Sequence, residues 1–394
     1  MIAIIYTLLL ALTIWILYIS GRSMQNPNNS YWKSAIPAIS AFTLNEGLRF
    51  GRGLDYNYYY HTFQEIAKGN QGDLEPVFYW LGRTVALLEG EWQAYVMLMS
   101  FILIISVIYF LENYRENIKY ILPLFPLFSL AAENLMRWFL GFSFILIALR
   151  NLYDYSQKGK KKINLILFIL FSFIGFQTHY GLLVVPVSYY FILKFKKPFF
   201  SPWVSISIYI LLCLIFDTNV MLSLIPYTEF ITNFEVFSGY SNNIDYWVTS
   251  GHGGGSASGV YYINMFVISL VYLGYLIYKR TPNDNAYIFA YNLFLFGCIS
   301  LPITRPIELL YRYNNLFLIF QFIIMGYILR YYYIKHLFKV NAFLKIFFLV
   351  SFLNYGRVIL FTPFMTNEKQ YLYVWDKDGA EYLNVYDVYL RHME

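Results

Sequence analysis

The stretch Gln93–Leu111, QAYVMLMSFILIISVIYFL, contains 19 residues and no charged side chain. A helix rises about 1.5 Å per residue, so this segment spans roughly 30 Å, which is the thickness of the hydrocarbon core of a bilayer. An uncharged run of this length predicts a transmembrane helix. Similar apolar segments recur from one end of the chain to the other, and they decide the fold class.

The composition of all 394 residues agrees with this interpretation. Hydrophobic residues make up 58%, aromatic residues 22% and charged residues only 13%, whereas a soluble domain carries about 25% charged residues. We therefore predict an all-α polytopic membrane protein with one membrane domain over 1–361. Its long outer loops are 49–92 and 217–259, and an outer C-terminal tail covers 362–394.

Twelve segments have the apolarity expected of spanning helices. They are 2–20, 33–48, 93–111, 119–133, 136–152, 163–177, 179–194, 202–216, 260–278, 285–301, 314–333 and 341–361. The run 119–152 is too long for one crossing and contains Pro123 and Pro126, so we divide it into a hairpin. The amphipathic segment 76–90 is interrupted by Arg83, and we expect an interfacial or re-entrant helix there, on the outer side.

Short loops rich in lysine and arginine predict the orientation, because such loops remain in the cytoplasm. With the N-terminus outside, every basic cluster lies on the cytoplasmic side. The clusters are Arg22 with Lys33, Arg115 with Lys119, Lys158–Lys162, Lys194–Lys197, Lys279 with Arg280, and Lys335 with Lys339. Twelve crossings then place the C-terminus outside as well.

The net charge of +6 does not indicate a nucleic-acid partner, because the lysines occupy separate short loops and form no continuous basic face. Cys213 and Cys298 both fall inside apolar segments. They are interpreted as small core residues, with no disulfide framework and no metal-ligand spacing.

Five arginines stand near helix ends on the predicted outer side: Arg49, Arg52, Arg137, Arg305 and Arg312. A charge at membrane depth costs about 2.5–3.5 kcal/mol, so a compensating partner is expected. The planar guanidinium fork binds phosphate in a bidentate manner, and we favour a phosphate or pyrophosphate site. The alternative is pairing with nearby carboxylates, of which the candidates are Glu46, Asp55, Glu133 and Glu308.

Two further features suggest sugar chemistry on the same side. His179, in QTHYG over 177–181, ends a predicted helix, where an imidazole can accept a proton from a sugar hydroxyl; satisfaction by a backbone carbonyl is the alternative. The segment 49–60, RFGRGLDYNYYY, combines arginines, Asp55 and aromatic rings. Aromatic faces bind sugar rings, although tyrosines also crowd ordinary membrane interfaces. Glu75, before Pro76, adds a carboxylate.

The order of these residues resembles that of bacterial polysaccharide polymerases of the EpsG type, which are related in role to the Wzy O-antigen polymerases. The motifs that carry the resemblance are Arg52 with Asp55-Tyr56, Glu75-Pro76, Arg137, Gln177-Thr-His179, Arg305 and Arg312-Tyr313. The resemblance covers roughly residues 1–335. Some relatives have a longer glycine run around the first arginine, so the alignment of Arg49 versus Arg52 stays open.

The resemblance implies glycosyl transfer at the outer face of the bacterial cytoplasmic membrane, in the assembly of O-antigen, capsule or exopolysaccharide. One undecaprenyl-pyrophosphate-linked chain donates its reducing-end sugar to a hydroxyl of another, and lipid pyrophosphate is released. No metal, nucleotide or other cofactor is implied. The expected partners are the lipid-linked oligosaccharides, the bilayer and other membrane proteins of polysaccharide assembly.

The resemblance carries functional positions over to Arg52, Asp55, Glu75, Arg137, His179 and Arg305. The acceptor hydroxyl needs a general base, for which the candidates are His179, Asp55 and Glu75; we favour His179 because the unperturbed pKa of histidine suits pH 7. Candidate substrate-binding residues are Arg49, Arg52, Arg137, Arg305, Arg312, Tyr56 and Tyr313.

Three other functions stay open. A flippase for lipid-linked oligosaccharides also needs interior arginines, but here the charges crowd one face and no two-fold repeat is visible. A membrane sugar O-acyltransferase would use an arginine and histidine pair on a bundle of many helices. A ligase that attaches finished polymer to an acceptor is a close neighbour of the polymerase interpretation.

Overall fold

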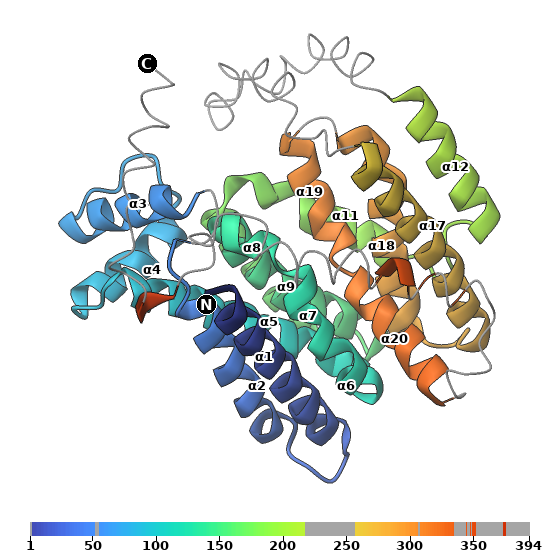
Figure 1. Ribbon diagram of the computed structural model, residues 1–394, viewed down its shortest axis with the longest axis horizontal. Helices are drawn as coiled ribbons and strands as arrows, with labels where there is room; N and C mark the ends of the chain where they lie inside the picture. The colour runs from blue at the N-terminus through green and yellow to red at the C-terminus, as the bar shows by residue number, and fades with distance from the viewer. Residues whose placement is uncertain are drawn as a thin grey trace. The chain divides into compact units, whose positions relative to one another are not determined.

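The computed structural model describes residues 2–51, 55–216, 257–305, 308–334, 344, 347, 349–351 and 373–375. Within these residues the chain is helical (Figure 1), apart from one isolated antiparallel bridge between Arg49 and Tyr373. The chain divides into two compact units. The first comprises Met1–Ser188 with Tyr355–Glu394, and the second comprises Tyr189–Asn354.

The first unit is built from long helices joined by short ones. Its long helices are α1 (Ile2–Gln25), α2 (Tyr31–Gly47), α3 (Tyr56–Lys68), α4 (Pro76–Leu87), α5 (Trp92–Leu111), α9 (Met136–Gln157) and α10 (Lys162–Thr178). Between α5 and α9 the chain passes through η1 (Glu112–Asn117), α6 (Ile118–Ile121), η2 (Leu122–Leu124), α7 (Phe125–Phe128) and α8 (Ala131–Asn134). The 3₁₀-helix η3 (Tyr180–Leu183) and α11 (Val184–Leu193) follow α10, and the first unit ends within α11 at Ser188.

The second unit contains α12 (Pro202–Ile215), α17 (Ala257–Arg280), α18 (Asn285–Thr304), α19 (Glu308–Leu318) and α20 (Gln321–Ile334). Buried tyrosines hold its helices together. The hydroxyls of Tyr287 and Tyr291 on α18 donate to the carbonyls of Gly274 and Val271 on α17, at 2.7 and 2.8 Å. Each hydroxyl thereby has the acceptor that a buried polar group requires.

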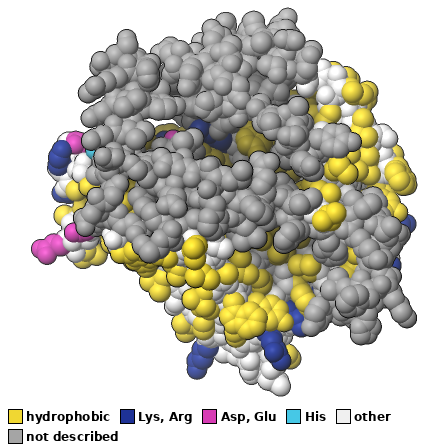
Figure 2. All heavy atoms as spheres, viewed as in Figure 1, with side chains coloured by type: hydrophobic (Ala, Val, Ile, Leu, Met, Phe, Trp, Pro, Cys, Tyr) yellow, Lys and Arg dark blue, Asp and Glu magenta, His cyan; other side chains and the backbone are white. Residues whose placement is uncertain are grey.

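The exposed surfaces of several helices are apolar, as lipid contact requires. On α1 the exposed hydrophobic residues recur every three or four positions, at Ile4, Leu8, Leu12, Trp15 and Ile19. Hydrophobic side chains cover much of the described surface in Figure 2. Soluble monomers rarely expose contiguous apolar patches of this kind. The pattern identifies a multi-pass membrane protein.

Among the described residues, four helical runs are long and apolar enough to cross a membrane: Ile4–Gln25, Trp92–Phe128, Asn285–Thr304 and Leu310–Tyr332. Three shorter apolar helices coincide with other predicted crossings, over Lys162–Thr178, Tyr180–Leu193 and Pro202–Ile215. The all-helical membrane fold is therefore confirmed. The number of twelve crossings, the side on which α3 and α4 lie and the placement of both termini stay predictions. Most of the predicted crossing 341–361 lies outside the described residues.

The predicted crossing 119–133 is not one continuous helix. Its residues form short pieces, with Pro123 in η2 and Pro126 in α7. Proline has no backbone N–H and its ring clashes with the carbonyl of the preceding turn, so two prolines three residues apart prevent a regular α-helix. The prolines therefore break the segment internally, beyond the hairpin division expected from the sequence.

The basic loops of the first unit meet at one end of that unit. Arg115 donates to the carbonyl oxygens of Met24, Asn26 and Asn29, at 2.8 to 3.0 Å. Lys158 lies 3.4 Å from the amide oxygen of Asn113. Arginine near a helix C-terminus compensates the unpaired carbonyls and the negative end of the helix dipole. Basic loops expected on one side of the membrane are therefore grouped together in space.

The helices α9 and α10 approach closely at a pair of glycines. A Cβ atom on Gly175 would lie 3.0 Å from the carbonyl oxygen of Gly141, and one on Gly141 would lie 3.1 Å from the carbonyl oxygen of Gly175. Small residues allow helix backbones to approach in this way within membranes. This contact joins α9, which has Arg137 in its first turn, to α10, which has His179 at its C-cap.

Substituting Gly175→Val is expected to destabilise the protein by about 1–3 kcal/mol, because the added methyl groups overpack a backbone contact. The exposed Ile169 on the same helix provides a control, and Ile169→Val is expected to change the stability by less than about 0.5 kcal/mol. The midpoint of thermal unfolding in detergent measures both effects. An unchanged midpoint for Gly175→Val would contradict the close crossing.

Candidate functional site

Glu75 begins α4 but does not cap it. It occupies the N-cap position with Pro76 at the first helical position, and its side chain makes no capping hydrogen bond. Its carboxylate instead accepts a hydrogen bond from Arg137, with 2.9 Å between Arg137 Nη1 and Glu75 Oε2. The side chain of Glu75 is only 7% exposed. A carboxylate buried to this degree requires a charged or hydrogen-bonding partner, and Arg137 supplies both.

Arg137 lies in the first turn of α9, where the helix dipole disfavours a positive charge. Glu75 compensates this charge from a position 62 residues earlier in the chain. The Arg137 guanidinium also lies 5.9 Å from the centre of the Phe78 ring on α4. Its side chain is 20% exposed, so the pair is partly accessible. The Arg137 side chain is therefore neither fully buried nor fully solvated.

His179 joins the same pair from the end of α10. Its Nδ1 atom lies 3.7 Å from Glu75 Oε1, and the backbone N–H of Tyr180 points to that oxygen at 3.4 Å. The edge of the Trp138 ring packs against the imidazole, with ring centres 4.7 Å apart. Three elements that are distant in sequence therefore bring Glu75, Arg137 and His179 into one cluster, named here the charged cluster.

The tautomer of a neutral His179 ring follows from its backbone contact. The N–H of Gly181 donates to Nδ1 of His179 at 3.1 Å. In a neutral imidazole one ring nitrogen accepts and the other carries the hydrogen. Nδ1 is the acceptor here, so in the neutral ring Nε2 carries the hydrogen and is the donor nitrogen. The backbone does satisfy His179, but through an N–H rather than through the carbonyl that the sequence suggested.

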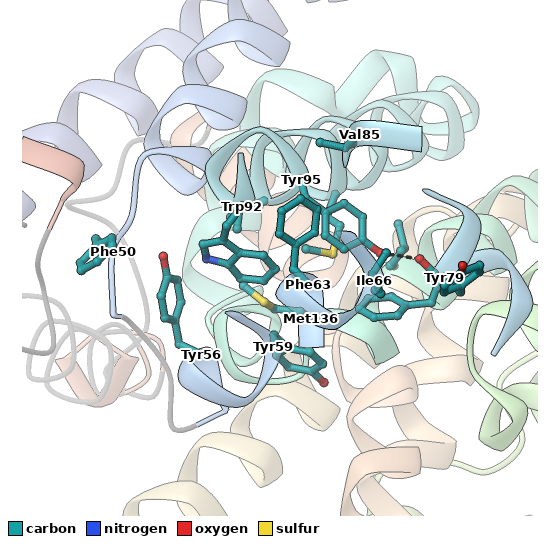
Figure 3. Close-up of a cluster of buried hydrophobic side chains, with 14 residues drawn as sticks. Phe50, Tyr56, Tyr59, Phe63, Ile66, Tyr79, Val85, Trp92, Tyr95 and Met136 are labelled. Carbon is teal, nitrogen blue, oxygen red and sulfur yellow. Dashed lines mark hydrogen bonds between the residues drawn. The ribbon is translucent and has the colours of Figure 1, made fainter. Parts of the chain in front are cut away.

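Aromatic side chains support the charged cluster from one side. Figure 3 shows Tyr56 and Phe63 of α3 packed against Trp92 of α5, and the Tyr59 ring lies 6.1 Å from that of Phe78 on α4. Burial raises the pKa of Tyr59 to about 12, while the nearby Arg137 acts to lower it. Tyr59 therefore stays protonated at neutral pH and lies next to the guanidinium. We infer that the aromatic cluster fixes α3 against the start of α9.

Arg49 forms its own ion pair. Its Nη1 atom lies 3.0 Å from Glu46 Oε2, and the two side chains are 5% and 12% exposed. Asn45 donates to the other oxygen of Glu46 at 2.9 Å. The alternative of carboxylate pairing, left open by the sequence, is therefore what the structure shows for Arg49. Removing one partner of a buried pair of this kind destabilises a protein by about 3–5 kcal/mol.

The remaining predicted residues of the first unit differ in how deeply they are buried. Asp55 precedes α3 at its N-cap and is partly buried. Tyr56 is 1% exposed, and burial raises its pKa to about 12; its ring belongs to the core, so stacking of a sugar on it would require the cluster to open. Arg52 lies outside the described residues. Glu133 is partly buried on α8.

The other predicted residues belong to the second unit. Arg305 follows α18 and is partly buried, and its charge acts on Tyr209 and Cys213 of α12. Arg312 and Tyr313 lie on α19 and are also partly buried. The backbone of Glu308 starts the same helix. A single hollow shared by all five arginines stays a prediction.

Sequence reasoning missed several contributors to the site. Trp138 could have been noticed because it follows Arg137 directly in an apolar helix. Gly181 had a weaker signal, although a Cβ atom there would lie 2.7 Å from the Trp138 ring. Tyr59 was one of many tyrosines. The Tyr180 contribution had no signal, because it is a backbone N–H that almost any residue supplies.

A model of the EpsG family matches residues 36–373 of this chain. The match begins within α2 and ends at Tyr373, so it contains the whole charged cluster as well as Arg305, Arg312 and Tyr313. Comparisons with curated proteins and with solved structures found no match.

Proposed function

The chain belongs to the EpsG family, and from this membership we propose that it polymerises oligosaccharide repeat units linked to undecaprenyl pyrophosphate. Membership itself makes it a membrane protein of the polysaccharide-polymerase type. The proposal adds the lipid-linked substrate, the outer face of the bacterial cytoplasmic membrane as the place of reaction, and both termini on that face. The products would be O-antigen, capsule or exopolysaccharide.

The contact between Glu75, Arg137 and His179 is the observation that carries this proposal. It combines a cation, a carboxylate and a histidine in one partly exposed place, at positions to which the resemblance assigns function. The cluster contains the charges that glycosyl transfer from a pyrophosphate requires. Negative charge develops on the leaving group, and the donor sugar becomes positive in the transition state.

In the proposed step, the acceptor hydroxyl oxygen forms a bond to the anomeric carbon of the donor sugar. The bond between that carbon and the pyrophosphate oxygen breaks, and its electron pair leaves with the lipid pyrophosphate. Arg137 stabilises this charge, since a guanidinium binds phosphate oxygens with two parallel N–H groups. His179 adds a donated hydrogen bond from Nε2.

The proton of the acceptor hydroxyl goes to a carboxylate in this scheme. The contact with Gly181 occupies Nδ1, the acceptor nitrogen of the neutral His179 ring, so Glu75 rather than His179 is proposed as the general base. Glu75 Oε1 faces His179 and Tyr180, while Oε2 pairs with Arg137. Asp55 stays a second candidate for the base. Arg305 is proposed to bind a pyrophosphate, and Arg312 stays a candidate for substrate binding.

Lipid-linked material from a strain that lacks the gene, complemented with either the natural protein or Glu75→Gln, tests the proposed function. Glutamine keeps the size of the side chain but removes the charge. We expect single repeat units to accumulate on the outer leaflet in both the deletion and the Glu75→Gln strain, and a polymer ladder with the natural protein. A gel of the extracted glycolipids provides the measurement.

The same gel, combined with labelling of outer-leaflet glycolipids in intact cells before extraction, separates the other functions. Repeat units trapped on the inner leaflet would indicate a flippase, and full ladders that lack an acyl group would indicate an acyltransferase. Full-length polymer that stays on the lipid carrier would indicate a ligase. Any of these three outcomes would contradict the polymerase proposal. Protein abundance, measured by immunoblot, shows whether the Glu75→Gln protein is present.

A further inference from the structure

A short C-terminal segment, 373–375, is bound to the end of α2. Tyr373 forms the antiparallel bridge with Arg49, and the N–H of Val374 donates to the carbonyl of Leu48 at 3.0 Å. The Tyr373 hydroxyl donates to the side-chain oxygen of Asn45 at 3.0 Å, across 328 residues of sequence. We name the pair Tyr373–Val374 the clasp.

The clasp is a specific contact rather than a loose association. Tyr373 is 1% exposed and packs with Tyr6 and Leu10 of α1. Trp375 stacks on the Tyr373 ring, with centres 4.8 Å apart and planes inclined by 10°. The contact thus combines a buried ring, a side-chain hydrogen bond and a backbone hydrogen bond, which together restrict the clasp to one register.

The segment held by the clasp carries a buried charge. Arg49 belongs to the connection between α2 and α3, and Gln93 of α5 donates to its carbonyl oxygen at 3.0 Å and also to that of Gly47. The Arg49 side chain pairs with Glu46, which Asn45 contacts. Asn45 therefore links the clasp directly to this ion pair through two hydrogen bonds.

The ion pair lies next to the start of α9. A cavity of about 20 Å³ separates Arg49 and Glu46 from Met136, the residue before Arg137. That space is sufficient for one water molecule, and Ser100 and Ser129 provide further polar groups in its lining. A shift of the Arg49 segment would change both this cavity and the entry into α3, where Tyr59 lies beside Arg137.

We propose that Tyr373 and Val374 are positioning residues that hold the connection between α2 and α3 in place, and through it the start of α9 with Arg137. The inference rests on the proposed function, because it requires the charged cluster to be the reaction centre. Small displacements of a catalytic group cost up to about 10²-fold in rate. The clasp therefore acts on turnover without touching substrate.

Paired substitutions at Val374 provide the main test. Val374→Pro removes the N–H that bonds to Leu48, and proline favours the extended conformation that the bridge gives Tyr373. Val374→Ala keeps the N–H and serves as the matched control. Using purified full-length protein and lipid-linked repeat units, we expect Val374→Pro to lower kcat by about 10- to 100-fold with KM within about threefold, and Val374→Ala to keep kcat within about twofold.

Tyr373→Phe provides a milder second variant, because it removes only the hydroxyl that bonds to Asn45. We expect its kcat to fall by about three- to tenfold, at temperatures well below unfolding, where a purely structural defect would leave kcat unchanged. If Val374→Pro folds and its kcat equals that of the natural protein, the inference is overturned. If Val374→Pro does not fold, the test rests on Tyr373→Phe, and a kcat equal to that of the natural protein in this variant overturns the inference.

The proposed function and the clasp fail in different ways. If Arg137→Lys abolishes polymer formation while both clasp variants keep their natural kcat, only the clasp is wrong. If Arg137→Lys retains full activity, the charged cluster is not the reaction centre, and the clasp loses its premise while the polymerase function stands. If the natural protein itself forms no polymer from lipid-linked repeat units, the proposed function fails.

Discussion

Arg137→Lys is expected to lower polymer formation by about 10²- to 10³-fold while protein abundance remains unchanged. Lysine keeps a positive charge near Glu75, whose Oε2 lies 2.9 Å from Arg137 Nη1, so the buried carboxylate retains a counter-charge. It loses the planar fork that binds two phosphate oxygens at once. The loss should therefore appear in turnover rather than in folding, and the rate of polymer formation by purified protein measures it.

Arg83 provides a matched control for this substitution. It lies on α4, the helix that Glu75 begins, and its guanidinium donates to the carbonyls of Ile66 and Ala67. We expect Arg83→Lys to keep polymer formation within about twofold, because lysine can still donate to these backbone carbonyls from a half-buried site outside the charged cluster. Equal losses for Arg83→Lys and Arg137→Lys would indicate a general effect of arginine replacement.

Arg305→Lys extends the comparison to the second unit. If Arg305 binds a pyrophosphate, its replacement should cripple polymer formation in the same way, with abundance unchanged. Polymer of natural length in both the Arg137→Lys and Arg305→Lys variants would refute pyrophosphate binding by these two arginines.

Two substitutions of His179 are expected to differ in activity by about tenfold or more, within the range of proton-transfer and hydrogen-bond effects at active sites. His179→Asn places an oxygen near the Nδ1 position, so it can still accept the Gly181 N–H but offers no donor at the Nε2 position. His179→Gln places an amide N–H close to the Nε2 position. Nδ1 of the natural ring accepts from Gly181, so in this scheme Nε2 is the donor nitrogen, and we expect glutamine to retain much more activity than asparagine.

The opposite mechanism predicts a different result. If His179 is the general base, as the sequence alone favoured, neither amide can take up the proton, and both variants should lose activity by about 10²- to 10⁴-fold. The dependence of kcat/KM on pH gives an independent readout, because an essential histidine base produces a loss of activity at acidic pH. Equal inactivation of both variants with such a profile in the natural protein would exclude the donor role.

Some features of the site were predictable from local sequence. Glu75 followed by Pro76 predicts the start of a helix, since proline is favoured at the first helical position, and α4 begins there. The polar His179 at the end of an apolar run likewise marks the end of α10. The all-helical membrane fold followed from segments such as Gln93–Leu111, which lies within α5.

The partners of these residues were not predictable. The sequence offered Glu46, Asp55, Glu133 and Glu308 as carboxylates for the arginines, whereas Arg137 pairs with Glu75. It also treated 362–394 as a separate tail, whereas Tyr373 within it is buried against α1 and α2. Both contacts join residues far apart in the chain, so no local pattern encodes them.

The sequence by itself determined that the chain is helical and embedded in a bilayer. The length and apolarity of a segment are local properties, and they decide directly whether it is stable in lipid. Tertiary structure alone decided which helix faces meet. In lipid, an apolar side chain is equally compatible with the bilayer and with a neighbouring helix, so hydrophobicity does not distinguish the two. Close packing, as at Gly141 and Gly175, settles the choice and brings Arg137, Glu75 and His179 together.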